Sequence, residues 1–344
     1  MRKSSRMNWR IIAILASTIP ILIIAVHFEI KLEDIFAIGI LPFLAAVGSI
    51  MVKLVLQGVK FAYIVRKYLG PVDSISKLIG VRMGSEFIKF TTPMFVGAEF
   101  LIIYWLHKKG ISTSKSSWVA ILDIVTEVLA GGLLSIIAGI IALMNGAVVV
   151  AAIILSTSIF VTTLWTILFF LSSKKTFQVP LGISSLVKKF GKDKGEHFVN
   201  QTNQWMQEIC SMSRKNFRTK ESKRVFTNGF ILSIISWLFY GLSFMIIANG
   251  TGFVIDLFDS LMAVMGANAI GNLPITVGGS GLAEFGIVAY LNNLDPFNFE
   301  IPVDSKEWSA VIGWRIATYY VPIAITWFLL VKLALSKYTK TSIS

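Results

Sequence analysis

The sequence predicts an all-α integral membrane protein with six spanning helices and two re-entrant helical hairpins related as an inverted repeat. Three observations predict this fold. Hydrophobic residues make up 55% of the 344 and charged residues only 15%, against about 25% charged residues in an ordinary soluble domain. Long uncharged runs separate the charges, and two similar apolar segments are interrupted by proline and glycine. We therefore expect a single polytopic membrane domain over residues 1–344.

Six runs have the length and composition of a spanning helix, since about 20 mostly apolar residues cross a bilayer core of roughly 30 Å. They are Ile11–His27, Ile35–Leu56, Trp118–Met144, Val148–Leu171, Gly229–Ala248 and Ser309–Ala334. The first run follows several basic residues, as a signal peptide does, but no small-x-small cleavage site comes after it. We expect it to be retained as a helix.

The distribution of basic residues predicts the orientation, because short loops rich in Lys and Arg lie on the cytoplasmic side. Residues 172–226 hold twelve Lys and Arg against four Asp and Glu, and are assigned to the cytoplasm together with Lys60. The mainly acidic segments 28–34 and 293–307 are assigned outside. This alternation predicts a multi-pass protein of the cell (plasma) membrane with cytoplasmic N- and C-termini.

The basic segment 172–226 is predicted to contain an amphipathic helix. Its apolar residues recur at helical spacing beside charged positions, the pattern of a helix that lies along lipid headgroups. They are Phe198, Trp205, Met206, Ile209 and Met212. Two interpretations remain open: simple anchoring on an anionic lipid surface, or a dedicated docking site for a headgroup or a protein.

The chain divides into two halves around this segment. Residues 1–171 form the first half, with a hairpin at about 72–106, and residues 227–336 form the second, with a hairpin at about 258–291. By the charge count the first hairpin begins and ends inside, and the second begins and ends outside. Each must therefore turn back within the membrane or lie on its surface.

The two hairpins resemble each other. Each is broken by proline and glycine, at Thr91–Gly97 with Pro93 and at Leu273–Gly281 with Pro274, and each break is followed by A-E-F-x-I-[IV]-x-[WY]-L. Such breaks free backbone groups that hydrocarbon cannot satisfy, so they survive only inside protein or against a wet cavity. Two similar segments of opposite polarity predict an inverted-topology repeat, which in transporters builds a site near the bilayer midplane.

Buried acidic residues are the candidate site. Glu99 and Glu284 follow the two breaks, where a glutamate costs about 2.5–3.5 kcal/mol to insert. A helix N-terminus returns only about 0.3–1 kcal/mol, or up to about 2 kcal/mol when partly buried. A cation, a proton or water must supply the remainder, and Arg315 is the strongest candidate partner. Asp123 and Glu127 add two acids, four residues apart on one helical face.

Two interpretations of these charges remain open: an interior salt-bridge network without a substrate, or a polar pathway for a headgroup. Gly278, Gly279 and Gly281 equally fit helix packing and a ligand cradle. Asn272 flanks the second break and is placed to hydrogen-bond its backbone. One cysteine and three scattered histidines exclude a disulfide within the chain and give no metal-ligand spacing. No cofactor, metal, nucleic-acid partner or enzymatic activity is expected.

The order of these motifs resembles the lysylphosphatidylglycerol synthase transmembrane-domain family, also called the flippase-like family. Pro93-x-x-x-Gly97-Ala98-Glu99, then Asp123 with Glu127, then the block Leu273–Glu284, then Arg315 with Tyr319 and Pro322 carry the resemblance. The resemblance implies a polytopic protein with re-entrant elements, similar to the flippase half of bacterial multiple-peptide-resistance factors. Their cytosolic aminoacyl-transferase is expected to be absent, since the sequence ends shortly after its last span.

The chain also departs from the family pattern. Two positions where the family often has arginine are Ile102 and Ile124, and the proline usual before the glycine pair is Val277. The resemblance therefore implies a related fold and activity, and leaves open which headgroup is handled.

We expect a lipid flippase-like transporter that moves a phospholipid or polyprenyl-linked headgroup between leaflets. In this hypothesis Arg315 meets phosphate through charge-assisted hydrogen bonds. The candidate substrate-binding or translocation residues are Pro93, Gly97, Glu99, Asp123, Glu127, Asn272, Pro274, Gly278, Gly279, Gly281, Glu284, Arg315 and Tyr319. Alternatives are an ion-coupled transporter of a small solute, or a non-transporting membrane anchor or regulatory partner. A homo-oligomer is compatible with each.

Overall fold

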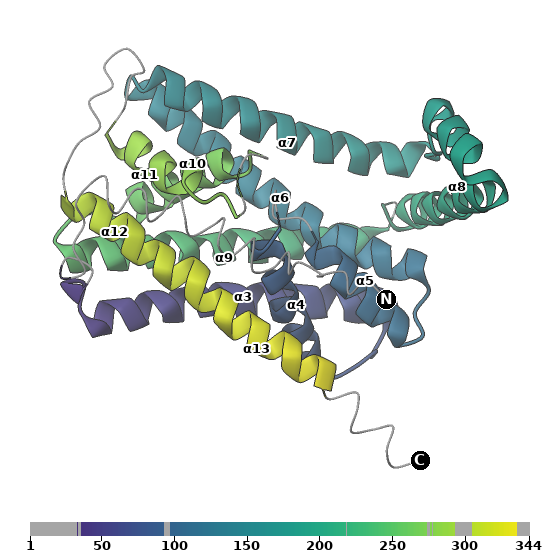
Figure 1. Ribbon diagram of the computed structural model, residues 1–344, viewed down its shortest axis with the longest axis horizontal. Coiled ribbons are helices and arrows are strands. Elements are labelled where there is room, and N and C mark those ends of the chain that lie inside the picture. Colours follow the sequence, from purple (N-terminus) through teal and green to yellow (C-terminus); the bar gives the residue numbers. More distant parts are fainter. Residues whose placement is uncertain are drawn as a thin grey trace, which may run out of the picture.

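A computed structural model describes residues 33, 36–92, 97–217, 219–273, 276, 278–292 and 305–335, and the regular structure in these ranges is helical. Eleven α-helices and one π-helical turn follow one another in these ranges (Figure 1). They are α3 (Ile40–Leu69), α4 (Ile75–Phe90), α5 (Ala98–Lys108), α6 (Thr113–Met144), α7 (Val148–Lys174), α8 (Leu181–Phe217), α9 (Lys220–Thr251), α10 (Leu257–Gly271), α11 (Leu282–Leu291), α12 (Ser305–Arg315), η1 (Ile316–Tyr320) and α13 (Val321–Leu335).

Five stretches of helix are long and apolar enough to cross a membrane. They are Ile40–Leu69, Thr113–Met144, Val148–Ser172, Lys220–Thr251 and Lys306–Leu333, the last made of α12, η1 and α13 together. They confirm five of the six predicted spans as candidate membrane helices. The remaining one, Ile11–His27, lies outside the described residues.

Helix α3 corrects the predicted end of the second span. The sequence pattern ended this span at Leu56 and placed Lys60 in a cytoplasmic loop, but the helix continues to Leu69 and Lys60 is fully buried. The count of positive residues misplaced this lysine, because such a count ignores whether a lysine pairs with a carboxylate from another helix. A lysine that pairs with carboxylates inside a bundle avoids most of the cost of a lysine facing lipid.

The spanning helices pack as an antiparallel bundle (Figure 1). One core cluster joins the start of α3 to the end of α9, through Ala46 and Ala248, and a second joins the end of α3 to the start of α9, through Val65 and Val225. Lipid offers no hydrophobic drive between helices, so close packing holds such bundles together. Gly241 illustrates this, since a Cβ there would lie 2.8 Å from the backbone of Leu261 on α10.

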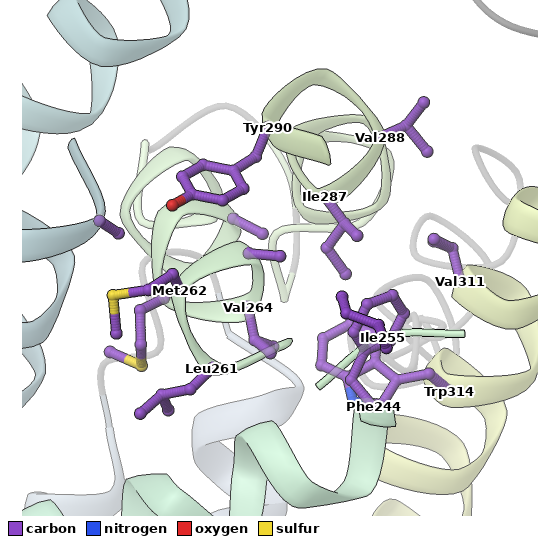
Figure 2. Close-up of a cluster of buried hydrophobic side chains, with 14 of the residues drawn as sticks. Phe244, Ile255, Leu261, Met262, Val264, Ile287, Val288, Tyr290, Val311 and Trp314 are labelled. Atoms are coloured by element: carbon purple, nitrogen blue, oxygen red, sulfur yellow. The ribbon is translucent and has the colours of Figure 1, made fainter. Parts of the chain in front are cut away.

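Two shorter helix pairs, α4–α5 and α10–α11, connect neighbouring spanning helices at opposite ends of the bundle. The pair α4–α5 joins α3 to α6 within the second core cluster, and α10–α11 joins α9 to α12 within the first. Figure 2 shows Ile287 and Tyr290 of α11 packed with Met262 and Val264 of α10 in that first cluster. Both pairs are interrupted at the predicted breaks, between Phe90 and Ala98 and between Gly271 and Leu282.

Helix α8 doubles back on itself and lies outside the bundle (Figure 1). An ion pair of 3.1 Å joins Lys188 to Glu196, eight residues later, whereas eight residues of straight helix span about 12 Å. A Cβ on Gly195 would lie 2.2 Å from the Val187 carbonyl oxygen. Glycine is therefore required where the two arms touch, and α8 is a helical hairpin.

The predicted apolar stripe of α8 is divided between two environments. Trp205, Ile209 and Met212 pack into the second core cluster, and the Trp205 indole donates to the Ser117 hydroxyl at 3.1 Å. Phe198, in contrast, is 61% exposed. The second arm of the hairpin is thus anchored on α6, and the exposed apolar side chains lie toward the tip.

Candidate functional site

Charged side chains of α3, α4 and α6 form a network inside the bundle, which we call the central network. Arg82 of α4 lies at its middle. Its guanidinium donates to Asp123 at 2.8 Å and to Glu127 at 2.8 Å, pairs with Glu86, and donates to the Gln57 side chain at 3.1 Å. Each of these carboxylates is no more than 5% exposed. One arginine therefore holds three buried acids.

Two lysines complete the central network. The Lys60 ammonium donates to the Asp123 carbonyl oxygen at 2.8 Å and lies 3.2 Å from the Asp123 carboxylate. The Lys89 ammonium lies 2.7 Å from Glu127 and 3.8 Å from Glu86. Lys60 is fully buried, whereas the Lys89 side chain is 22% exposed. Lys89 thus lies at the rim of the central network, whose other charged side chains are buried.

Helical periodicity places these groups together. Asp123 and Glu127, four residues apart on α6, share one helical face as the sequence predicts, and both contact Arg82. The residues that sequence reasoning missed were Arg82, Glu86 and Lys89 on α4, at positions i, i+4 and i+7. Three charges on one face of an otherwise apolar segment were a usable pattern.

A second ion pair lies where α11 meets α12. The Arg315 guanidinium is 2.7 Å from the Glu284 carboxylate, and both side chains are at most 3% exposed. Arg315 also donates to the Gly278 carbonyl oxygen and to the Ser280 hydroxyl, the latter at 3.1 Å. The predicted pairing of Arg315 with a buried glutamate is confirmed for Glu284. The guanidinium N–H groups of Arg315 therefore bond to groups of the protein itself.

Tyr319 joins the two charged regions. Its ring lies under the Arg315 guanidinium, 4.0 Å from ring centre to carbon, and its hydroxyl donates to the Phe90 carbonyl oxygen at 2.7 Å. Phe90 directly follows Lys89, the rim of the central network.

The π-helical turn that carries Tyr319 has a local cause. Pro322 follows it and cannot donate a backbone hydrogen bond, so the regular α-helical pattern is interrupted just before it. Such π-turns re-aim side chains and are frequent at functional sites. Here the turn buries Tyr319 to 2% exposure between α4 and the glycine-rich segment.

The glycines after the second break pack tightly. A Cβ on Gly278 would lie 2.2 Å from the Tyr319 hydroxyl, and one on Gly279 would lie 3.0 Å from the backbone of Gly271. Both residues have positive φ, 59° and 65°. These contacts favour the packing interpretation for Gly278 and Gly279.

The two motif glutamates share one local arrangement but differ in burial. Each lies in the first turn of its helix and accepts a hydrogen bond from the backbone of the preceding glycine: Gly97 to Glu99 at 3.1 Å, and Gly281 to Glu284 at 2.7 Å. Glu284 is fully buried, whereas Glu99 is only half-buried. Arg315 therefore compensates one of the two carboxylates, and Glu99 lies outside both charged regions.

The remaining candidates are placed as follows. Asn272 is the C-cap of α10, and its backbone N–H donates to Asn268. Pro93 and Pro274 lie outside the described residues. Within the ranges that the structure describes, no three His, Cys, Asp or Glu side chains are grouped to hold a metal ion.

The fold and these charges together define a class: a multi-pass helical membrane protein with ion pairs buried inside its helical bundle. The chain belongs to the family described as the lysylphosphatidylglycerol synthase TM region, which it matches over residues 11–326. This confirms the resemblance that the motifs indicate, and it relates the chain to flippase-like membrane proteins. Comparison with curated proteins and with solved structures finds no match.

Proposed function

We propose that the protein moves a polar or modified lipid headgroup between the two leaflets of the membrane. The observation that carries this proposal is the central network: seven charged or polar side chains of α3, α4 and α6 gathered inside the bundle, with Lys89 partly exposed. Buried charges are expensive in a bilayer, and those that are retained generally mark substrate or ion pathways.

The proposal includes a membrane arrangement. The pairs α4–α5 and α10–α11 are re-entrant hairpins of an inverted repeat, entering from opposite sides and meeting near the midplane. Support comes from their positions in opposite core clusters and from the shared backbone contact of Glu99 and Glu284. In this arrangement the headgroup crosses beside the charges while its apolar chains stay in lipid.

Orientation follows from the charges. The basic helix α8 and both termini are cytoplasmic, the host membrane is the plasma membrane, and the exposed tip of α8 rests on anionic lipid. The tip combines exposed Leu186 and Phe198 with several lysines, the composition of an interfacial helix. The protein is proposed to act as a transporter and not as an enzyme.

Proteoliposomes test the transport activity. Vesicles carrying wild-type protein receive a fluorescent phospholipid or a fluorescent polyprenyl-phosphate sugar, and its movement between leaflets is timed against empty vesicles. We expect faster movement of at least one lipid, and a loss of about tenfold or more in Glu284→Gln and Arg315→Ala. Lys188→Gln, an exposed change on α8, is the matched control and should leave the rate unchanged.

The alternatives predict other outcomes of the same experiment. Solute uptake driven by a proton or sodium gradient, without lipid movement, would indicate an ion-coupled solute transporter. Normal cellular function after both motif glutamates are neutralised would indicate an anchor or regulatory partner. Lipid movement no faster than in empty vesicles would contradict the proposal.

A further inference from the structure

Lys53 lies near the middle of α3, and its ammonium lies over the faces of two aromatic rings. Its ammonium lies 4.3 Å from the centre of the Trp237 ring and 4.1 Å from that of Tyr240, both on α9. Lys53 is half-buried, and α3 extends well beyond it in both directions. A spanning helix therefore carries this charge at the depth where charge is most costly.

The other buried cations all have carboxylate partners. Lys60 and Arg82 pair with Asp123, Lys89 pairs with Glu127, and Arg315 pairs with Glu284. Among the residues that the structure describes, no carboxylate oxygen lies within 4 Å of the Lys53 ammonium. Lys53 thus differs from every neighbouring cation.

Around Lys53, positively charged side chains outnumber carboxylates by one. Lys53 lies four residues before Gln57 and seven before Lys60 on α3, so the three side chains share one helix face beside the central network. Lys53, Lys60, Arg82 and Lys89 face three carboxylates there, those of Glu86, Asp123 and Glu127. One positive charge is therefore left over, and those three carboxylates are already held by the other cations.

Aromatic contacts do not replace a counter-ion. The two rings lower the cost of the buried ammonium, but they carry no net charge and leave its positive charge unbalanced. An anionic group beside Lys53 would restore the balance. Lys89, whose side chain is 22% exposed, is a second cation of this region that such a group could reach.

We propose that Lys53 binds the phosphate group of an anionic lipid. The inference rests on the proposed function and deepens it, because it gives the transported headgroup a net negative charge and moves its phosphate contact away from Arg315. Arg315 already contacts Glu284, Ser280 and the Gly278 carbonyl oxygen. The shared chemistry is a phosphate ester or inorganic phosphate, and the experiment separates the two sources.

Binding to the purified full-length protein in neutral detergent tests the site. Native mass spectrometry counts bound phosphatidylglycerol and bound phosphatidylcholine on wild-type protein, Lys53→Gln and Lys53→Arg. We expect Lys53→Gln to lose affinity for phosphatidylglycerol by about tenfold or more, and Lys53→Arg to retain it. Phosphatidylcholine binding should change less, because the choline ammonium neutralises the phosphate charge. Lys67→Gln is the matched control, because Lys67 lies near the exposed end of the same helix.

A competition arm distinguishes the sources. If inorganic phosphate at low millimolar concentration displaces phosphatidylglycerol from wild-type protein, the site takes the free anion, and if it does not, the site requires the lipid; either result supports a phosphate site at Lys53. Equal binding of phosphatidylglycerol by wild type and a well-folded Lys53→Gln would overturn it. Retention of charge-dependent binding without lipid movement in vesicles would instead contradict the proposed function and leave this site standing.

Discussion

At the residue scale, Arg82 determines whether the central network is stable. Its guanidinium contacts three carboxylates and one amide, all buried. A buried ion pair adds little stability compared with apolar residues of similar volume, but removing one partner leaves the others charged and unpaired. The network is therefore sensitive to the loss of this side chain.

We predict that Arg82→Met lowers the free energy of unfolding in detergent by about 3–5 kcal/mol, because three buried carboxylates would then share only Lys60 and Lys89 as cationic partners. Thermal unfolding followed by circular dichroism measures this. Arg66→Met, at an exposed position on α3, should change stability by no more than about 0.5 kcal/mol. Equal shifts for the two variants would show that Arg82 is not the centre of the network.

Asp73, in the linker between α3 and α4, should contribute pH-dependent stability. Partial burial alone would raise its pKa, but the Lys109 ammonium at 2.7 Å and the Ser74 backbone N–H outweigh this and lower the pKa. A lowered folded-state pKa means that the stabilisation is present above the unfolded value of about 3.9 and is lost as the pH falls through the folded-state value. Wild type should therefore lose up to about 1 kcal/mol more than Asp73→Asn on acidification. Parallel pH profiles of thermal stability would contradict this.

At the element scale, the sequence predicted those helices and helix ends that have a local cause. Apolar length predicted the spanning helices, and proline with glycine predicted where α4 and α10 end. The fold-back of α8 was invisible, because its apolar and basic residues continue at helical spacing through the bend. The tertiary contacts reveal it: the ion pair between Lys188 and Glu196, and the close approach of Gly195 to the Val187 carbonyl oxygen.

The α8 hairpin should open when Gly195 gains a side chain. A short bismaleimide should cross-link Lys188→Cys to Glu196→Cys, whose native side chains form an ion pair. Adding Gly195→Val should reduce cross-linking several-fold, because its Cβ would overlap the Val187 carbonyl oxygen. Gly182→Val, where a Cβ meets nothing within 4 Å, is the matched control. Unchanged cross-linking with Gly195→Val would indicate that the arms do not touch there.

At the scale of the whole molecule, the sequence predicted part of the candidate site. Asp123, Glu127, Glu284 and Arg315 were identified, because an acid or arginine inside an apolar run is conspicuous. Lys60 was assigned to a loop, since charge counting cannot see that Asp123 reaches it from α6. Partnership between distant helices is a tertiary property, and no local pattern encodes it.

The proposed topology makes a prediction about access. The native Cys210 is 2% exposed, so added cysteines can be labelled selectively. A membrane-impermeant maleimide added to intact cells should label Val254→Cys, at an 86% exposed position between α9 and α10, but not Lys188→Cys on α8. Permeabilised cells should allow both to be labelled. Labelling of both variants in intact cells would refute the orientation.

The central claim is that the charges inside the bundle handle a lipid headgroup, and the rate of phospholipid movement in vesicles tests it most directly at Lys89. Lys89 is the partly exposed cation of the central network, so Lys89→Gln disturbs the pathway with less structural cost than changes at Arg82. We predict that Lys89→Gln slows movement by about tenfold or more, while Lys188→Gln keeps the wild-type rate. A correctly folded Lys89→Gln that moves lipid as fast as wild type would contradict the account.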